Sequence, residues 1–266
     1  MQVQLPVGEL KVEAVVDFVQ WVMNPLGLSL PLLGGLYLGK MVGEYALDLV
    51  ITTTLKLVSF PLLPSRVNPT KTKGLERLEF KDWYYLGLNQ FIEATFVSHL
   101  LALMLTLPRS ADEVNVFNTV LAWYTCFLVD DFFYYWLHRA MHLQWLYPWI
   151  HKHHHRQVLP KRGYLDAANE HPLEQVGGLA CVWTGLMAAQ ALFGLHAVTV
   201  LAFFGLFATF QFLNHTPYDV RLGAWALGYS VRAHEMHHRY LKCNYAQNNM
   251  WYDMLLGTFA EYKNAA

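Results

Sequence analysis

The stretch VGGLACVWTGLMAAQALF (176–193) and the stretch HAVTVLAFFGLFATFQFL (196–213) are each 18 residues long and contain no Asp, Glu, Lys or Arg. A helix that crosses the hydrocarbon core of a bilayer, about 30 Å thick, needs about 20 predominantly apolar residues. Only Gly194 and Leu195 separate the two stretches. They therefore predict two membrane-spanning helices joined by a tight hairpin.

Three earlier stretches extend this interpretation. Residues 84–107 and 114–137 are apolar apart from a few polar side chains and predict two more spanning helices. Residues 32–57 carry four charges, which fit either a spanning helix that faces the bundle interior or an interfacial helix. The chain is 55% hydrophobic, 15% aromatic and only 15% charged, against about 25% charged residues in a typical soluble domain. The predicted fold is an all-α, polytopic membrane helix bundle of about four to five spanning helices, forming one domain over residues 1–266.

Twelve of the thirteen histidines lie between His138 and His238, and eight of them form three clusters, with His153 lying inside the second as an additional residue. The clusters are HRAMH (138–142), HKHHH (151–155) and HEMHH (234–238). Imidazole is the commonest neutral metal ligand near pH 7, and residues three or four apart share one face of a helix. One ion rarely needs more than three or four ligands. The clusters therefore predict a cap with two metal ions, and the predicted ligands are His138, His142, His151, His154, His155, His234, His237 and His238.

Two further histidines lie at the ends of the hairpin helices. His171 in NEHPLEQ and His215 in FLNHTPY are on the same side as the clusters and are further candidate ligands. Asp131 and Glu174 are candidates to accept the second N–H of a ligand imidazole, the usual arrangement around metal-bound histidine. His99 lies inside an early helix, His196 lies on the opposite side of the bilayer, and His153 is expected to be a solvated neighbour, so none of these three is a predicted ligand.

The predicted topology places all three clusters on one face of the membrane. Fifteen of the nineteen Lys and Arg residues lie in segments 61–82, 138–173 and 214–266, which share that face, so the positive-inside rule makes it cytosolic. The three cysteines show no disulfide spacing, which fits a reduced, cytosol-facing site. The first residues carry acidic side chains and do not resemble a cleaved signal peptide. The net charge of −1 argues against a nucleic-acid partner.

Alternative interpretations compete for the third cluster. HEMHH also matches H-E-x-x-H, in which His234 and His238 would bind zinc and Glu235 would act as the general base of a membrane metalloprotease. Glu235 and His238 match half of the Glu-x-x-His signature of soluble di-iron bundles. A metal-storing or lipid-binding membrane protein without enzymatic activity is a third interpretation. The first two leave the histidines of the other clusters without a role.

The order of the motifs resembles that of the integral-membrane fatty acid hydroxylase / sterol desaturase superfamily. The resemblance covers about residues 131–259. It is carried by the strings DFFYYWLHRAMH (131–142), YPWIHKHHH (147–155), NEHPLE (169–174) and HHRYLKCNYAQNNMWYDMLLGTF (237–259). The string HPLE is most similar to the C-4 methylsterol oxidase branch.

This resemblance implies two irons at the cytosolic mouth of the bundle and oxidation of an unactivated C–H bond of a membrane lipid by O₂. A sterol is the expected substrate; a sterol or fatty-acyl desaturase and an alkyl-lipid hydroxylase remain alternatives within the superfamily. Electrons would come from NAD(P)H through a separate reductase and a b-type cytochrome such as cytochrome b5. The chain shows no G-x-G-x-x-G fingerprint of its own. The endoplasmic reticulum is the implied location.

Overall fold

The computed structural model describes residues 12–64, 77–223 and 228–263 of the chain. Within these ranges the regular structure is helical, and two isolated β-bridges pair Leu62 with Tyr218 and Arg221 with Ser230. The all-α prediction is confirmed. The α-helices are α1 (Val12–Met23), α2 (Leu30–Leu57), α3 (Phe80–Thr106), α4 (Ala122–Met141), α5 (Tyr164–Ala167), α6 (Pro172–Phe193), α7 (Ala197–Asn214), α8 (Val231–Tyr240) and α9 (Trp251–Leu256). Short 3₁₀ turns lie at Ala111–Glu113 and His154–Arg156, and a π-helical turn at Phe117–Leu121 leads into α4.

The predicted hairpin is present as α6 and α7. Helix α6 begins at a Pro, whose fixed φ suits the first turn of a helix. It ends at Gly194, whose φ of +70° few other residues tolerate. Two residues later, Nδ1 of His196 accepts a hydrogen bond from the backbone N–H of Val198 and caps the start of α7. A helix stop and a helix start within three residues fold the chain back on itself.

Helices α4 and α6 pack against each other most closely at Gly185. A Cβ atom added at Gly185 would lie 2.6 Å from the backbone oxygen of Cys126, so only glycine permits this approach of the two backbones. Next to this contact, Phe127 of α4 packs edge-on against Phe203 of α7 and is fully buried. The core of the bundle is therefore formed by α4, α6 and α7.

Three helices in the described part of the chain are long and apolar enough to cross a membrane: α3, α6 and α7. Helix α2 is 28 residues long but carries charged side chains on the side that meets α3 and α5. Its other faces expose apolar side chains such as Leu32, Val42 and Leu49. Such a distribution is the reverse of that on a water-exposed helix and fits a helix surrounded by lipid.

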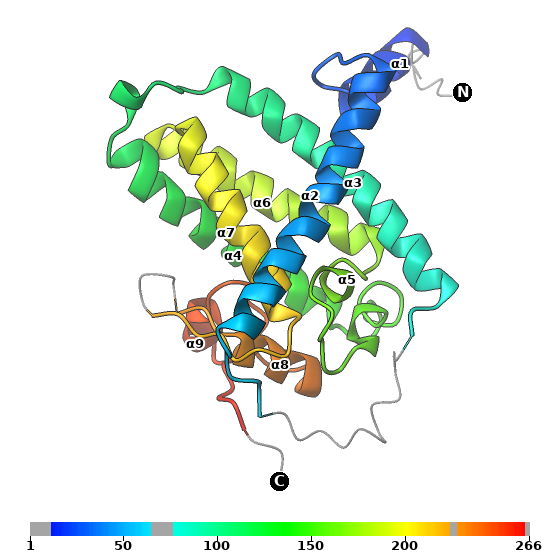
Figure 1. The fold of residues 1–266 in the computed structure, drawn as a ribbon, viewed down its shortest axis with the longest axis vertical. Helices are drawn as coiled ribbons and strands as arrows, with labels where there is room; N and C mark the ends of the chain where they lie inside the picture. Colours follow the sequence, from blue (N-terminus) through cyan, green and yellow to red (C-terminus); the bar gives the residue numbers. More distant parts are fainter. Residues whose placement is uncertain (1–11, 65–76, 224–227, 264–266) are drawn as a thin grey trace, which may run out of the picture.

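The ends of these helices bring the histidine clusters together. The bundle has α1 at one end and α8 with α9 at the other (Figure 1). The C-terminal ends of α4 and α7 meet α8 through His142 and His215, and the N-terminal end of α6 lies near the second cluster, since Glu174 contacts His151. His196 lies at the opposite end, against the backbone oxygen of Ser110. Of the sequence features used above, the first eleven residues and the basic residues Arg66, Lys71 and Lys73 lie outside the described residues.

Candidate metal centre

Nine histidine side chains converge in two groups at the α8 end of the bundle. The first histidine group contains His138, His142, His151, His155 and His237. The second histidine group contains His154, His215, His234 and His238. Within each group the ring nitrogens lie within 4.8 Å of one another. All eight clustered histidines and His215 are therefore in positions from which they could share two metal ions.

Each H-x-x-H-H cluster supplies both groups, and helix geometry explains how. Residues four apart on a helix differ by about 40° around the axis, whereas adjacent residues differ by about 100°. His234 and His238, four apart on α8, have Nε2 atoms 3.0 Å apart in the second group. His237 points instead into the first group, where its Nε2 lies 3.1 Å from that of His155. His151 and His155 likewise pair in the first group, at 2.9 Å.

Backbone carbonyl groups fix the orientation of several rings. The Nδ1–H of His138 donates to the carbonyl of Tyr245, and that of His237 to the carbonyl of Cys243, each at 2.7 Å. In the second group, His215 donates to Gln211 at 2.8 Å and His238 to Gln157 at 2.9 Å. A neutral imidazole that donates through Nδ1 keeps a bare lone pair on Nε2, which is the form that binds a metal.

These bare lone pairs face each other, which makes a cation the natural occupant. His215 and His238 direct Nε2 lone pairs at Nε2 of His234, at 3.2 and 3.0 Å. A single N–H on His234 could satisfy only one of them. Two ligands at right angles on an ion with metal–nitrogen bonds of about 2.1 Å lie about 3.0 Å apart. The spacings therefore fit the edges of a coordination polyhedron, and the residues present suit a metal in each group.

Burial keeps these imidazoles neutral. Removal from water is the main cause that lowers the pKa of His237 to about 4, and it holds the pKa values of His151, His155, His234 and His238 well below the usual range of histidine. Neighbouring imidazoles of both groups lower the pKa values of the latter four further, because two positive charges at this distance repel. Neutral rings are available as ligands at neutral pH.

The carboxylates predicted to support the ligands differ in their contacts. Oε1 of Glu174 lies 2.6 Å from Nδ1 of His151, and both side chains are almost completely buried. Asp131 instead accepts hydrogen bonds from the backbone N–H groups of Gln247, Asn248 and Asn249. Asp131 therefore holds the chain just after Tyr245, whose carbonyl orients His138, and acts at one remove from the histidines.

His171 and His153 lie outside both histidine groups. Nδ1 of His171 accepts a hydrogen bond from the backbone N–H of Leu173 and caps α6. His153 was expected to be solvated, but it is buried, with Nε2 2.9 Å from Oδ1 of Asn169 and 3.0 Å from Oδ1 of Asp82. An acidic partner in α3, far away in the sequence, is what makes a buried position tolerable for His153.

Sequence reasoning did not identify the four carbonyl groups that orient the rings. Every residue has a carbonyl, so no residue type marks one as an acceptor. A partial signal exists in Asp253 of the WYD string, whose carboxylate accepts hydrogen bonds from the backbone N–H groups of Tyr245 and Ala246, both at 2.8 Å. That buried carboxylate shapes the turn on which the Tyr245 carbonyl lies.

Glu235 does not face the metal-binding groups. Its Oε1 accepts a hydrogen bond from the hydroxyl of Tyr262 at 3.2 Å and lies 3.5 Å from the guanidinium of Arg239. The general base of an H-E-x-x-H protease must reach the metal-bound water. His234 and His238 share the second group with two histidines from elsewhere in the chain, a donor set that the protease motif does not contain. The metalloprotease interpretation is therefore not favoured.

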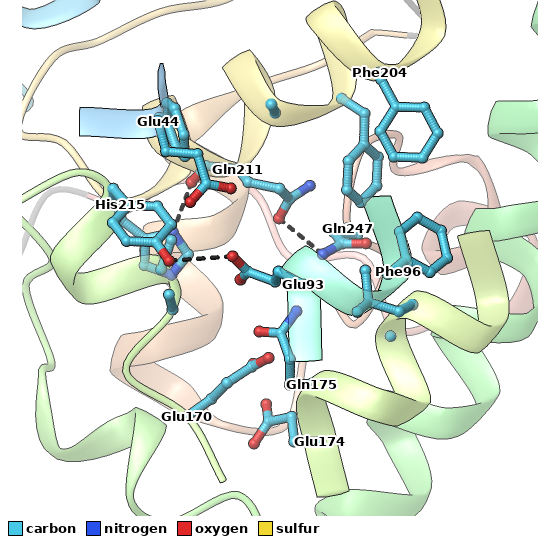
Figure 2. Close-up of a pocket in the computed structure, with 18 of the residues that line it drawn as sticks. Glu44, Glu93, Phe96, Glu170, Glu174, Gln175, Phe204, Gln211, His215 and Gln247 are labelled. Atoms are coloured by element: carbon cyan, nitrogen blue, oxygen red, sulfur yellow. Dashed lines mark hydrogen bonds between the residues drawn. The ribbon is translucent and has the colours of Figure 1, made fainter. Parts of the chain in front are cut away.

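A cavity opens from the second histidine group into the bundle. His154, His215 and His234 line it together with apolar side chains of α3, α6 and α7, among them Phe96 and Phe207. Figure 2 shows His215, Glu44 and Glu93 around one part of the cavity, and Phe96 and Phe204 on the other side. The cavity thus has an apolar part, which is typical of a binding site for an apolar small molecule, and a part lined by charged and polar side chains.

The sequence model of the fatty acid hydroxylase family matches residues 123–258, just over half of the chain. The methylsterol monooxygenase erg25A of Aspergillus fumigatus is 37% identical over 142 residues, which cover 50% of this chain and 45% of that protein. Methylsterol monooxygenase 1 of Gallus gallus is 27% identical over 204 residues, which cover 74% of this chain and 67% of that protein. The very-long-chain aldehyde decarbonylase GL1-11 of Oryza sativa subsp. indica is 30% identical over 148 residues, 52% of each. No solved structure matches the chain.

The aligned part of the chain spans about half the length of the first of these relatives. The matched residues include α4, α6, α7 and α8, and with them all nine histidines of the two groups. The family match and the converging histidines thus concern the same part of the fold. On both grounds, the chain belongs to the fatty acid hydroxylase family.

Proposed function

We propose that this protein is a membrane oxygenase that holds two iron ions and uses O₂ and electrons from NAD(P)H to oxidise an unactivated C–H bond of a membrane lipid, with a methyl-bearing sterol as substrate. The observation that carries the proposal is the convergence of nine histidines, eight of them buried, in two groups. Two of the relatives are methylsterol monooxygenases, which supports the substrate class. GL1-11 is instead an aldehyde decarbonylase, so an alkyl-lipid hydroxylase or a desaturase is the second candidate.

Each histidine group would hold one iron. The irons would supply the activation of O₂ and the removal of hydrogen from carbon, which no amino-acid side chain can perform. The chain itself fixes the rings in place: carbonyl groups hold His138, His215, His237 and His238, and Glu174 contacts His151. Rings that are oriented before the metal binds need no reorganisation when it does.

The cavity would bring the lipid to the second group and keep water away. Phe96, Phe204 and Phe207 give an apolar wall on α3 and α7, two helices suited to cross a membrane. A lipid could then enter from the bilayer without passing through water. Exclusion of water also protects the reacting carbon from side reactions.

For the topology, we propose that α2 and α4 cross the membrane with α3, α6 and α7, and that the histidine groups face the cytosol in the endoplasmic reticulum. The support is the distribution of Lys and Arg along the sequence and the apolar outer faces of α2. A cytosolic site would be accessible to cytochrome b5 and its reductase as electron donors. The basic residues around the site would attract an acidic donor.

The first experiment is the metal content of protein purified in detergent from iron-supplemented cells. About two irons per chain are expected, with O₂ uptake that depends on a 4-methylated sterol, NAD(P)H, cytochrome b5 and its reductase. The variant His151→Ala should lose the iron of the first group and O₂ uptake, while His99→Ala, outside both groups, should keep both irons and the uptake. Two bound zinc ions would require reconstitution with ferrous iron, since overexpression can load the wrong metal.

Two results would contradict the proposal. Full O₂ uptake by His151→Ala would show that the first group is not needed for turnover. A single zinc ion, together with a proteolytic activity that Glu235→Gln abolishes and His138→Ala leaves intact, would establish the protease instead. Product analysis separates the remaining candidates, since a hydroxylase makes an alcohol or acid and a desaturase makes a double bond.

A further inference from the structure

A cluster of charged and polar side chains lies between α2, α3 and α5. This polar cluster consists of Lys40 and Glu44 of α2, Gln90 and Glu93 of α3, and Tyr164 of α5. The ammonium of Lys40 contacts Glu93, lies 2.6 Å from Oε2 of Glu44 and donates to Oε1 of Gln90 at 3.0 Å. The hydroxyl of Tyr164 donates to Oε2 of Glu93 at 3.1 Å. The five side chains form one hydrogen-bonded unit.

The polar cluster lies where charged side chains are unfavourable for the free energy of folding. The side chain of Lys40 is only 5% exposed, and Glu93 lies midway along α3, a helix suited to cross a membrane. Charged groups inside a membrane bundle cost several kcal/mol and are usually retained for a function. Lys40, Glu44, Gln90 and Glu93 also precede residue 123, so they lie outside the part of the chain that the family match covers. No histidine of either group accepts a hydrogen bond from them.

The polar cluster and the second histidine group face the same cavity. Its lining includes Lys40, Glu44, Glu93 and Tyr164 as well as His154, His215 and His234. Figure 2 shows Glu44, Glu93 and His215 on neighbouring parts of the wall. A further acidic group on this wall is Glu174, which is 2% exposed and whose side chain is hydrogen-bonded to that of Glu170.

We propose that the polar cluster binds the hydroxyl group of a neutral lipid and thereby places the carbons next to that hydroxyl at the second histidine group. The inference rests on the proposed oxygenase function and adds to it the chemistry of the substrate's polar end. A hydroxyl group can donate to Glu44 or Glu93 and needs no free cation, which suits a cluster in which the ammonium of Lys40 already contacts Glu44, Gln90 and Glu93.

A carboxylate would not match. Lys40 is the only Lys or Arg among the described residues that line the cavity, and it already contacts two carboxylates. An incoming fatty-acid anion would meet Glu44, Glu93 and Glu174 without a free cation to offset them. The structure thus favours a lipid alcohol over a free fatty acid, with the rest of the lipid against Phe96, Phe204 and Phe207.

The experiment compares three ligands on the wild-type protein in lipid nanodiscs: a 4-methylated sterol with a free 3-hydroxyl, the same sterol as its 3-acetate, and stearic acid. The alcohol should bind about tenfold more tightly than the acetate, because the acetate cannot donate to a carboxylate. Stearic acid should bind at least as weakly as the acetate. Equal binding of alcohol and acetate, or tightest binding of stearic acid, would overturn the inference.

Two pairs of variants test the cluster itself. Glu93→Gln should lower the affinity for the alcohol about tenfold and leave that for the acetate unchanged, whereas Glu113→Gln, exposed outside the cavity, should change neither. Lys40→Met should likewise act on the alcohol alone, with the exposed Lys56→Met on the same helix as its control. A cluster that only joins α2 to the bundle would lower the melting temperature and shift both affinities together.

The assay measures binding without turnover, so its failure is distinguishable from failure of the proposed function. Two irons and sterol-dependent O₂ uptake, combined with equal binding of alcohol and acetate, would retain the oxygenase and reject the role of the polar cluster. Should Glu93→Gln fail to fold, the ligand series on the wild-type protein still decides the question.

Discussion

The two histidine groups are built in the same way but face different surroundings. Each combines helical histidines four residues apart with histidines from loops, and in each the Nδ1 atoms of two rings donate to backbone carbonyl groups. Three members of the second group line the cavity, whereas no member of the first group does. In the first group His142 is half-buried, while the other eight histidines are buried.

This difference suggests a division of work within one centre. The second group would meet the lipid through the cavity, whereas the first group approaches the protein surface at His142. Substrate and electron donor could then reach the centre from separate sides. The predictions below test whether the two groups are separate metal sites and which residues belong to each.

The largest effect is expected from removing one ligand of each group. His234→Ala and His237→Ala should each lower sterol-dependent O₂ uptake by more than about 100-fold, since ligand loss exceeds the 10- to 100-fold cost of losing a supporting contact. Each variant should retain about one iron per chain, measured by mass spectrometry of the purified protein, because the other group is left intact. Loss of both irons in either variant would show that the two groups are not separate sites, and retention of both would show that the replaced histidine is not needed to hold metal.

A smaller effect, confined to the first group, is expected from Glu174→Gln. The amide keeps the size of the side chain but replaces one oxygen of the carboxyl group that lies 2.6 Å from Nδ1 of His151 with an NH₂ group. Activity or iron affinity should fall by about 10- to 100-fold. Titration with a chelator should release one iron early and the other as in the wild type. Glu113→Gln provides the control. Loss of both irons at equal chelator concentration would place Glu174 in the support of both groups or of the fold.

The contrast between the groups also shows what a sequence can predict. Charge-free stretches of 18 residues identified α6 and α7 because crossing a bilayer imposes a length and a composition. The spacing of HRAMH and HEMHH predicted shared faces because helix geometry is local. Assignment of His154 to one group and His151 to the other was not possible, since it depends on how a loop meets α8. The same holds for His153, whose acidic partner Asp82 lies in α3.

Carboxylates were the harder part of the site. Glu174 and Asp131 were both chosen by their position near a histidine motif, yet only Glu174 contacts a histidine. Asp131 lies on α4, the helix that carries His138, but its carboxylate accepts hydrogen bonds from the backbone of residues 247–249. These partners are more than a hundred residues away in the sequence. Helical periodicity predicts the face of the helix on which a side chain lies. It does not predict which distant part of the chain packs against that face.

The smallest effect is expected from His171→Ala, which tests whether His171 is a metal ligand. His171 lies outside both groups and caps α6 through Leu173. Loss of a cap costs about 1 kcal/mol, so the melting temperature should fall slightly while both irons and O₂ uptake persist. His171→Asn, which can accept the same hydrogen bond, should restore the melting temperature. If both variants lose an iron, His171 is a ligand in the metal-loaded protein, and α6 must then shift when metal binds, since its first turn begins at this residue.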